Sequence, residues 1–288
     1  MAYALDLIRD HALHWPEKAK TDFRSRYLKQ SAGLKEASAL HNLLNRALQE
    51  LNDGHSRLIT PAMQQRRVPG WPEARLVSGS AMVTVPACIL SSQSEAEAFA
   101  NTIAEHIQNL ARSKPTGWII DLRQNFGGNM WPMLAGLYPL LGPGMVGAFI
   151  DREGRRQNWI LSWGAASVGD QVRCAIKAEA TAHQQSGRIA VLTDRTTASS
   201  GEAIATAFRC WPRSRSFGDC TAGASTSNSS FQMPDGCILA LTTGVFMDRG
   251  GGTYGGPLIP DERVDPQRGD DTVERASAWI MYQRDIPS

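Results

Sequence analysis

Cysteine is scarce in this sequence, and its pattern speaks against two kinds of site. The five cysteines among 288 residues are scattered, odd in number, and contain no C-x-x-C pair. A disulfide framework needs cysteines that pair, and a structural zinc site is normally announced by ligands at short, regular spacing, so neither is expected. Cys88 and Cys237 lie in apolar runs and are predicted to be small core residues.

Long apolar runs and charge of one sign are also missing. No stretch reaches the roughly 18 apolar residues that a membrane-spanning helix needs. The N-terminus carries acids and histidines where a signal peptide needs a basic region and an apolar run. The net charge of +2, without a dense Lys/Arg block, gives no reason to expect nucleic-acid binding. These features predict a cytoplasmic protein without a membrane span, unless a leader has been removed.

Cofactor signatures are absent as well. The chain has no Walker-type loop and no set of residues at metal-ligand spacing, so no cofactor and no metal are expected. His11, His14 and His41 fall in helical stretches and are predicted to be surface or capping residues.

Apolar periodicity indicates a helical N-terminal subdomain over residues 1–57, followed by a core over residues 58–288. Hydrophobic residues make up 42% of the chain, which suffices for one sizeable core and a smaller subdomain. Two helical faces are marked by leucines and other apolar residues at three- and four-residue spacing. They are Leu5, Ile8, Ala12 and Trp15, then Leu34, Ala37, Leu40, Leu44, Ala47, Leu48 and Leu51.

The stretch from residue 188 to 209 has the pattern strand, small-residue turn, helix. Residues 189–192 are an apolar run typical of a buried strand, and residues 196–202 (TTASSGE) are small and polar. Such a turn presents a serine hydroxyl beside the backbone N–H groups of a helix N-terminus. The alternative is that Ser199 or Ser200 only caps the helix, with Glu202 completing a capping box.

A second apolar run, residues 118–122, is typical of a buried parallel strand and leads into a glycine-rich loop at residues 123–129. Other expected elements are a strand at 81–85, helices at 95–112, 130–141 and 270–283, a hairpin over 145–163, and a strand over 237–246. Residues 164–187 show no recognisable pattern.

Six motifs occur in a fixed order: LNDGHSRL (51–58), GWIIDLRQNFGGNM (117–130), TTASSGE (196–202), FGDCTAG (217–223), MPDG (233–236) and PLIPDERVD (257–265). Together the motifs resemble the S41 serine peptidases, the family of C-terminal processing proteases and tricorn-type peptidases. The resemblance implies an α/β fold with a ClpP/crotonase-like sheet-and-helix core. The interval between His55 and Gly117 is too short for the PDZ domain that many members of the family carry.

The resemblance also implies roles for individual residues. Ser199 lies at the nucleophile position of the T-A-S-x-G-E pattern, and His55 at the general-base position of the tricorn-like members. Either Gly127 or Gly128 would supply one oxyanion-hole N–H, and Ser200 the other. Ser200 is the alternative nucleophile and His183 the alternative base.

Two features distinguish this chain from its apparent relatives. Ala224 stands where C-terminal processing members have their catalytic lysine, which leaves a Ser199–His55 dyad. Gly54 and Gly255 replace a serine and a glutamate that support the histidine in tricorn-like members. The candidates for orienting His55 are therefore Asp53, Asp248 and Glu202, and Asn125 is a further supporting residue of the glycine loop.

The predicted function is a serine peptidase that cleaves peptides or unfolded polypeptide and needs no cofactor. One alternative is a scaffold that has lost catalysis and binds a peptide or an apolar ligand. Another is a hydrolase of non-peptide esters or amides.

Overall fold

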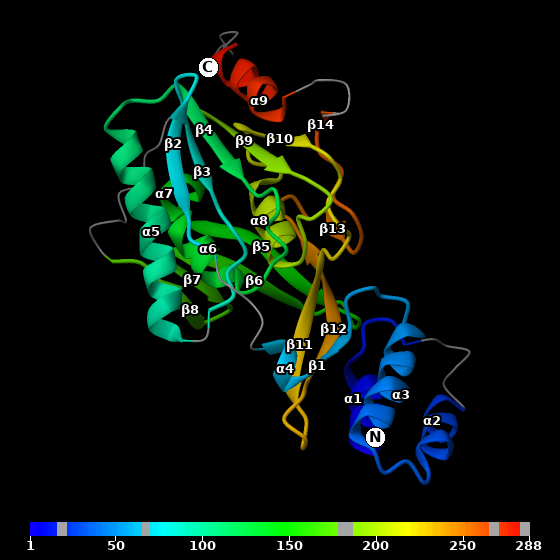
Figure 1. Ribbon diagram of the computed structural model, residues 1–288. Helices are drawn as coiled ribbons and strands as arrows, with labels where there is room; N and C mark the ends of the chain where they lie inside the picture. Colours follow the sequence, from blue (N-terminus) through cyan, green and yellow to red (C-terminus); the bar gives the residue numbers. More distant parts are fainter. Residues whose placement is uncertain (16–21, 65–69, 91, 178–186, 265–270, 283–288) are drawn as a thin grey trace. The chain divides into compact units, whose positions relative to one another are not determined.

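The computed structural model describes residues 1–15, 22–64, 70–90, 92–177, 187–264 and 271–282 (Figure 1). The chain forms two compact units, each assembled from three segments. Unit 1 comprises Met1–Arg67, Ile150–Arg156 and Thr226–Val245, and unit 2 comprises Val68–Phe149, Gln157–Ser225 and Phe246–Ser288. His183 lies outside the described residues.

Unit 1 combines the N-terminal helices with strands from late in the chain. Its elements are α1 (Ala2–His11), α2 (Phe23–Ser31), α3 (Ala37–Gln49), β1 (Arg57–Ile59), α4 (Pro61–Gln64), β11 (Thr226–Gln232) and most of β12 (Ile238–Met247). Both β1 and β11 pair antiparallel with β12. The buried faces of α1 and α3 form one cluster with Leu239 and Leu241 on the inward side of β12. The predicted second face is buried only in its later part, since Leu34 and Ala37 are exposed. The N-terminal helices expected from periodicity are present, and the unit that contains them also includes residues 150–156 and 226–245.

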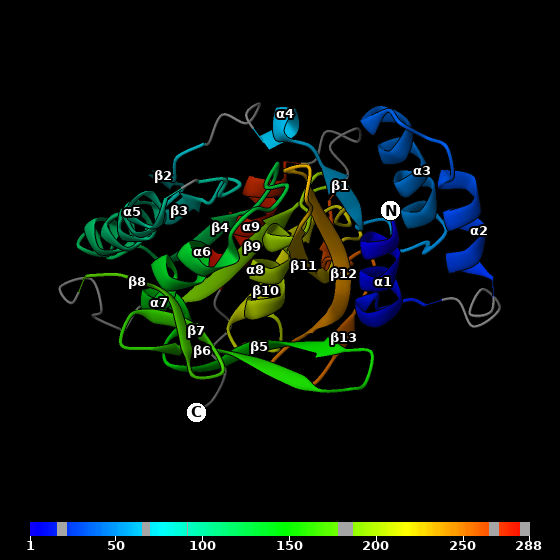
Figure 2. The same cartoon turned by 90° about the horizontal axis from the view of Figure 1, so that it is seen from below.

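Unit 2 contains a six-stranded sheet with the order β14-β10-β9-β4-β3-β2. The strands from β3 to β14 along this order are parallel, and β2 is antiparallel to β3. Their bounds are β2 (Glu73–Val77), β3 (Ser80–Thr84), β4 (Gly117–Asp121), β9 (Arg188–Thr193), β10 (Ser214–Gly218) and β14 (Glu262–Arg263). The helix α5 (Gln93–Ala111) lies alongside β2 and β3 (Figure 1 and Figure 2).

The central strands β4 and β9 carry uninterrupted apolar runs between their ends because both sheet faces are covered. Trp118 and Ile120 of β4 pack into the cluster that contains α5, α6 (Met130–Gly136) and α8 (Ser200–Phe208). Ile119, between them, packs on the opposite face against α9 (Thr272–Met281). Successive side chains of a strand point to opposite faces, so a continuous apolar run is what a doubly covered strand requires.

The second sheet has the order β1-β12-β5-β6-β7-β8, with β11 and β13 also paired to β12. Its remaining strands are β5 (Gly144–Asp151), β6 (Arg156–Ser162), β7 (Ala165–Val168), β8 (Gln171–Ala175) and β13 (Thr253–Tyr254). The β5–β6 hairpin confirms the prediction for residues 145–163. The strands β7 and β8 are not evident in the sequence, because their small and polar residues show no clear alternation.

The helix expected over residues 130–141 is interrupted. Helix α6 ends at Gly136, and α7 (Tyr138–Leu141) is a separate turn with Pro139 near its start. Proline has no N–H to donate, and its ring crowds the carbonyl four residues earlier, so one continuous helix cannot pass through it.

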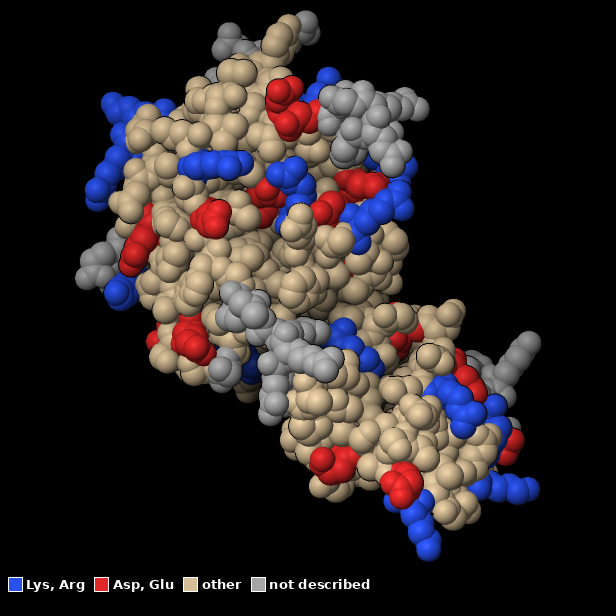
Figure 3. All heavy atoms as spheres, in the orientation of Figure 1, with Lys and Arg blue, Asp and Glu red and all other residues tan. Residues whose placement is uncertain are grey.

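The α/β class predicted from the sequence is confirmed by this arrangement. Among the described helices, none is both long and apolar enough to cross a membrane. Lys/Arg and Asp/Glu side chains are interspersed on the face shown in Figure 3, which is otherwise formed by uncharged residues.

Candidate functional site

Two neighbouring parallel strands bring the glycine loop and the serine turn together in unit 2. Strands β4 and β9 are paired in parallel, so their C-terminal ends lie at the same edge of the sheet. The loop after β4 carries Asn125, Gly127 and Gly128, and the loop after β9 carries Ser199. The Ala198 N–H donates to the Asn125 carbonyl over 2.9 Å, which ties the two loops directly.

Ser199 has an unusual backbone conformation at the start of α8. Its φ of 52° and ψ of −115° lie in a region that non-glycine residues rarely adopt. A serine on a sharp, strained strand-to-helix turn is the geometry of a nucleophile elbow. The Ser199 side chain is half-buried, whereas Ser200 is 7% exposed.

The two adjacent serines have different hydrogen-bonding roles. The Ser200 hydroxyl donates to the Gly128 carbonyl, so it is engaged in holding the glycine loop. Glu202 accepts the Ser199 N–H over 2.8 Å, which is the glutamate half of the capping box anticipated from the sequence. The serine turn therefore combines a helix cap with a half-exposed serine that is held in a strained conformation.

The two glycines of the loop differ in whether their N–H groups already have a hydrogen-bond partner. The Gly127 N–H donates to the Asn125 side-chain oxygen over 2.9 Å and is therefore already used. For the Gly128 N–H and the Ser200 N–H, no partner occurs within the described ranges of the chain. Gly128, rather than Gly127, is then the glycine whose N–H can serve an oxyanion.

Gly127 and Gly128 are needed for two reasons: their backbone conformation, and the short distance between the loop and neighbouring atoms. Their φ values are +111° for Gly127 and +105° for Gly128. A Cβ on Gly127 would lie 2.8 Å from the Ser199 Cβ, and one on Gly128 would lie 2.2 Å from the Cys88 carbonyl oxygen. Only glycine fits a loop that passes so close to the serine turn.

Asn125 is fully buried and organises the loop from within. Its amide nitrogen donates to the carbonyls of Val85 and Pro86, at 2.9 and 3.2 Å. Its side-chain oxygen accepts the Gly127 N–H, so all three contacts fix the path of the loop. The contacts show that Asn125 holds the glycine loop; its support of a catalytic site stays a prediction.

Glu202 is a buried acid that connects the serine turn to residues 221–223. Its carboxylate accepts hydrogen bonds from the Thr221 hydroxyl and from the Gly223 N–H, the latter over 3.0 Å. Burial raises the pKa of Glu202, and the hydrogen bonds it accepts lower it in part. Both carboxylate oxygens are thus engaged by partners in unit 2.

His55 belongs to unit 1, where its imidazole contacts a residue that the sequence did not suggest. Its Nδ1 lies 2.7 Å from the Thr226 hydroxyl oxygen, and both side chains are buried. Burial, together with the positive charge of Arg57, lowers the pKa of His55 to about 4. The imidazole is therefore neutral at pH 7, as a general base must be.

The three acids proposed to orient His55 have other partners. Asp53 accepts hydrogen bonds from the His55 and Ser56 N–H groups at 3.0 and 2.7 Å, so it holds the backbone rather than the ring. Asp248 accepts the N–H groups of a tight glycine turn and the Tyr254 hydroxyl. Thr226 opens the polar strand β11, and no pattern in the sequence marks it as a partner of His55.

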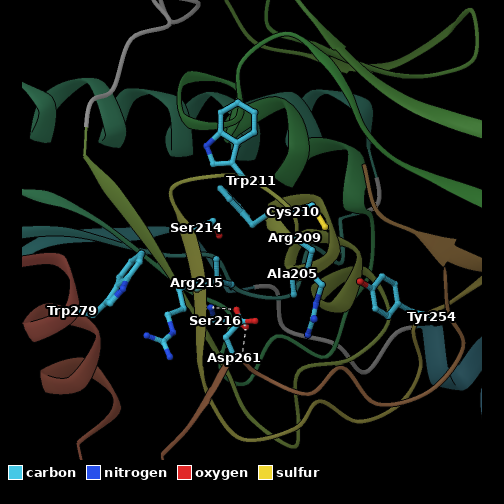
Figure 4. Close-up of a pocket in the computed structure, with 12 residues that line it drawn as sticks. Ala205, Arg209, Cys210, Trp211, Ser214, Arg215, Ser216, Tyr254, Asp261 and Trp279 are labelled. Carbon is cyan, nitrogen blue, oxygen red and sulfur yellow. Dashed lines mark hydrogen bonds between the residues drawn. The ribbon is translucent and has the colours of Figure 1, made fainter. Parts of the chain in front are cut away.

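A separate pocket of about 410 Å³ lies at the other end of α8 (Figure 4). Ala205, Arg209, Trp211 and Tyr254 are among its lining residues, and none of the residues predicted to act in catalysis is. On one wall of the pocket, the Ser216 hydroxyl donates to Asp261 over 2.7 Å, as the dashed lines in Figure 4 show.

Comparisons with known proteins agree with the motifs. Residues 82–264 match the profile of Peptidase family S41. The "Nisin-resistance protein" of Lactococcus lactis subsp. lactis is 30% identical over 213 residues, which are 74% of this chain and 63% of that protein. The chain thus spans less than two thirds of that relative's length.

Solved structures show the same fold. A lipoprotein from Streptococcus agalactiae superposes with a TM-score of 0.81 and 26% identity, over 97% of this chain and 94% of that one. The photosystem II D1 C-terminal processing protease superposes with a TM-score of 0.62 and 14% identity, over 96% and 95% of the two chains. At 14% identity the second similarity concerns the fold alone.

Proposed function

Because this chain belongs to peptidase family S41, as the order of its motifs had indicated, we propose that it is a serine endopeptidase that uses Ser199 and His55. In this mechanism Ser199 attacks the scissile carbonyl and His55 takes its proton, then returns the proton to the leaving amine. The N–H groups of Gly128 and Ser200 stabilise the oxyanion. The substrate is a peptide or an unfolded polypeptide.

The observation that carries the proposal is the half-exposed Ser199 in its strained turn, against the glycine loop. Capping alone would not require a φ of 52° at this position, since ordinary cap residues have extended backbones. The N–H groups of Gly128 and Ser200 have no partner in the described chain and are available to an oxyanion. The start of α8 adds a positive helix-dipole end.

The test is reaction with a fluorophosphonate, which labels only an activated serine. Wild type should react, and mass spectrometry of the digested protein should locate the adduct on Ser199. Labelling should disappear in Ser199→Ala, fall strongly in His55→Ala and persist in Ser200→Ala. An adduct on Ser200 would reassign the nucleophile, and an unlabelled wild type between pH 6 and 9 would refute the proposal. Nisin is the first peptide to test for cleavage, because the 30%-identical relative is named for resistance to it.

A second candidate function is a scaffold that has lost catalysis and binds a peptide or an apolar ligand. The observation favouring it is that a hydroxyl, not a carboxylate, contacts the ring of His55. A hydroxyl stabilises an imidazolium less than a carboxylate does. Peptide binding without fluorophosphonate labelling would be the corresponding result.

Thr226→Val should slow labelling by about tenfold to a hundredfold, a part of what a positioned general base contributes. The valine keeps the shape of the side chain and removes the hydroxyl that holds Nδ1. Thr226→Ser should restore most of the rate. Thr243→Val, which removes a threonine hydroxyl that contacts Ser229 in the same hairpin, is the matched control and should leave the rate unchanged. Equal rates for the two valine variants would exclude a positioning role for Thr226.

Labelling should be lost only as the pH falls through about 4, because that is where His55 becomes protonated. The lowered pKa of His55 also makes the stability of the protein depend on pH. The folded pKa lies below the unfolded value of about 6.5, so the unfolded state binds more protons between pH 6.5 and 4. Stability should therefore decrease as the pH is lowered from 6.5 to 4, and it should decrease less steeply in His55→Gln. A labelling midpoint near pH 6.5 would contradict this environment for His55.

A further inference from the structure

Outside the proposed active site, three potential metal ligands converge in unit 1. His41 lies on α3, and Asp235 and Cys237 lie on the turn between β11 and β12. The His41 Nε2 is 2.6 Å from the Asp235 Oδ2 and 3.6 Å from the Cys237 Sγ. All three donor atoms lie within 4.8 Å of one another.

We propose that His41, Asp235 and Cys237 form a zinc-binding site with three protein ligands and one coordination position open to solvent. Imidazole, carboxylate and thiolate are the three ligand types that zinc takes in proteins. A thiolate and a carboxylate together carry the two negative charges that neutralise Zn²⁺. The donor set favours zinc over magnesium or calcium, which take oxygen ligands.

The arrangement is not that of a cysteine–histidine–acid catalytic triad. In a triad the nucleophile and the acid bind different ring nitrogens, so that the acid orients the base. Here the thiol and the carboxylate both approach Nε2 of His41. Convergence of the thiol and the carboxylate on one ring nitrogen places three donor atoms around a common centre.

The distances are close to those of a four-coordinate site. With zinc bonds of roughly 2.0 Å to nitrogen and oxygen and 2.3 Å to sulfur, tetrahedral geometry separates the donor atoms by roughly 3.3 to 3.6 Å. The distance of 3.6 Å from Sγ to Nε2 already fits. The Oδ2 of Asp235 must withdraw by about 0.7 Å from its 2.6 Å contact with Nε2. Asp235 can do so because its side chain is 45% exposed on a turn.

The cluster is accessible to a cation from solvent. Cys237 is 1% exposed, but the side chains of His41 and Asp235 are 25% and 45% exposed, so a metal can enter from their side. The charge of the metal would compensate the buried thiolate that it binds.

Such a site would join α3 to the β11–β12 turn, two parts of the chain 194 residues apart. The sequence predicts a surface position for His41 and a core position for Cys237. It does not reveal the cluster, because an Asp-x-Cys pair and a distant histidine have no regular spacing.

The test uses Co²⁺ as a spectroscopic substitute for zinc, in the full chain after treatment with a chelator. The two other cysteines with exposed surface are first replaced, giving a Cys210→Ser/Cys220→Ser background that retains Cys237. One equivalent of Co²⁺ should give the visible bands of four-coordinate cobalt and a thiolate-to-cobalt charge-transfer band in the near ultraviolet. Zinc should displace the cobalt and raise the thermal midpoint.

In the same background, Cys237→Ser should remove the charge-transfer band, and His41→Asn should weaken binding by at least tenfold. His14→Asn, which changes an exposed histidine outside the cluster, should have no effect. If Cys237→Ser fails to fold, His41→Asn decides, since it alters a partly exposed side chain. No charge-transfer band in the background protein, a band that persists in Cys237→Ser, or an unchanged cobalt affinity in His41→Asn would overturn the proposal.

Discussion

Glu202→Ala should lower the free energy of unfolding by about 3–5 kcal/mol, because it leaves several buried donors without an acceptor. The carboxylate is fully buried and accepts hydrogen bonds from the Ser199 N–H, the Thr221 hydroxyl and the Gly223 N–H. The serine turn would also lose the contact that fixes its backbone, so fluorophosphonate labelling should disappear. Chemical denaturation and the labelling rate measure the two effects.

The chain contains a matched control for this substitution. Helix α5 begins with the same capping box, made by Ser92 and Glu95, at an exposed position. Glu95→Ala removes the equivalent carboxylate where water can replace it, and should cost only about 0.5–1 kcal/mol. Labelling of Ser199 should be unaffected. Equal destabilisation by the two alanine variants would show that Glu202 acts only as a helix cap.

Gly128→Ala should abolish labelling and destabilise the protein by at least about 3 kcal/mol. The new Cβ would lie 2.2 Å from the Cys88 carbonyl oxygen, so the backbone must move. That movement would break the hydrogen bonds that join Cys88 to the loop, from the Cys88 N–H to the Gly127 carbonyl and from the Asn129 N–H to the Cys88 carbonyl. The proposed oxyanion donor would move with them.

Gly144→Ala separates the conformational part of this effect from the steric part. Gly144 also has a strongly positive φ, +118°, but a Cβ added there would meet no atom of the described chain within 4 Å. The substitution should cost about 1–2 kcal/mol from backbone strain alone and leave labelling intact. If Gly128→Ala behaved like Gly144→Ala, close packing against Cys88 would not be what requires a glycine.

The fold could be predicted where burial produces a recognisable pattern of apolar residues in the sequence. Strands β4 and β9 are apolar at every position facing a helix layer on either side, so the runs at 118–122 and 189–192 stand out. Strands β7, β8 and β11 do not, because they are short, polar or only partly buried. A single sequence also does not indicate which strands will pair with one another.

The same contrast applies to the candidate site. Local motifs located Ser199 and the two glycines, because each needs a particular backbone conformation that restricts the neighbouring residues. Choosing between Gly127 and Gly128 required knowing that Asn125 occupies the Gly127 N–H. Thr226 is 171 residues from His55, and no local rule connects a threonine at the start of a strand with a distant imidazole.

Unit 1 is assembled from three separate segments of the chain, so its parts become available at different times during synthesis. The faces of α1 and α3 are buried against Leu239 and Leu241 of β12, which belong to the segment Thr226–Val245. A growing chain that has reached Ser225 therefore carries the N-terminal helices without the strand that covers part of their apolar faces. Those faces are candidate chaperone-binding surfaces until most of the chain has left the ribosome. His55 acquires its Thr226 contact only at that late stage, so the proposed base is assembled after the serine turn has been made.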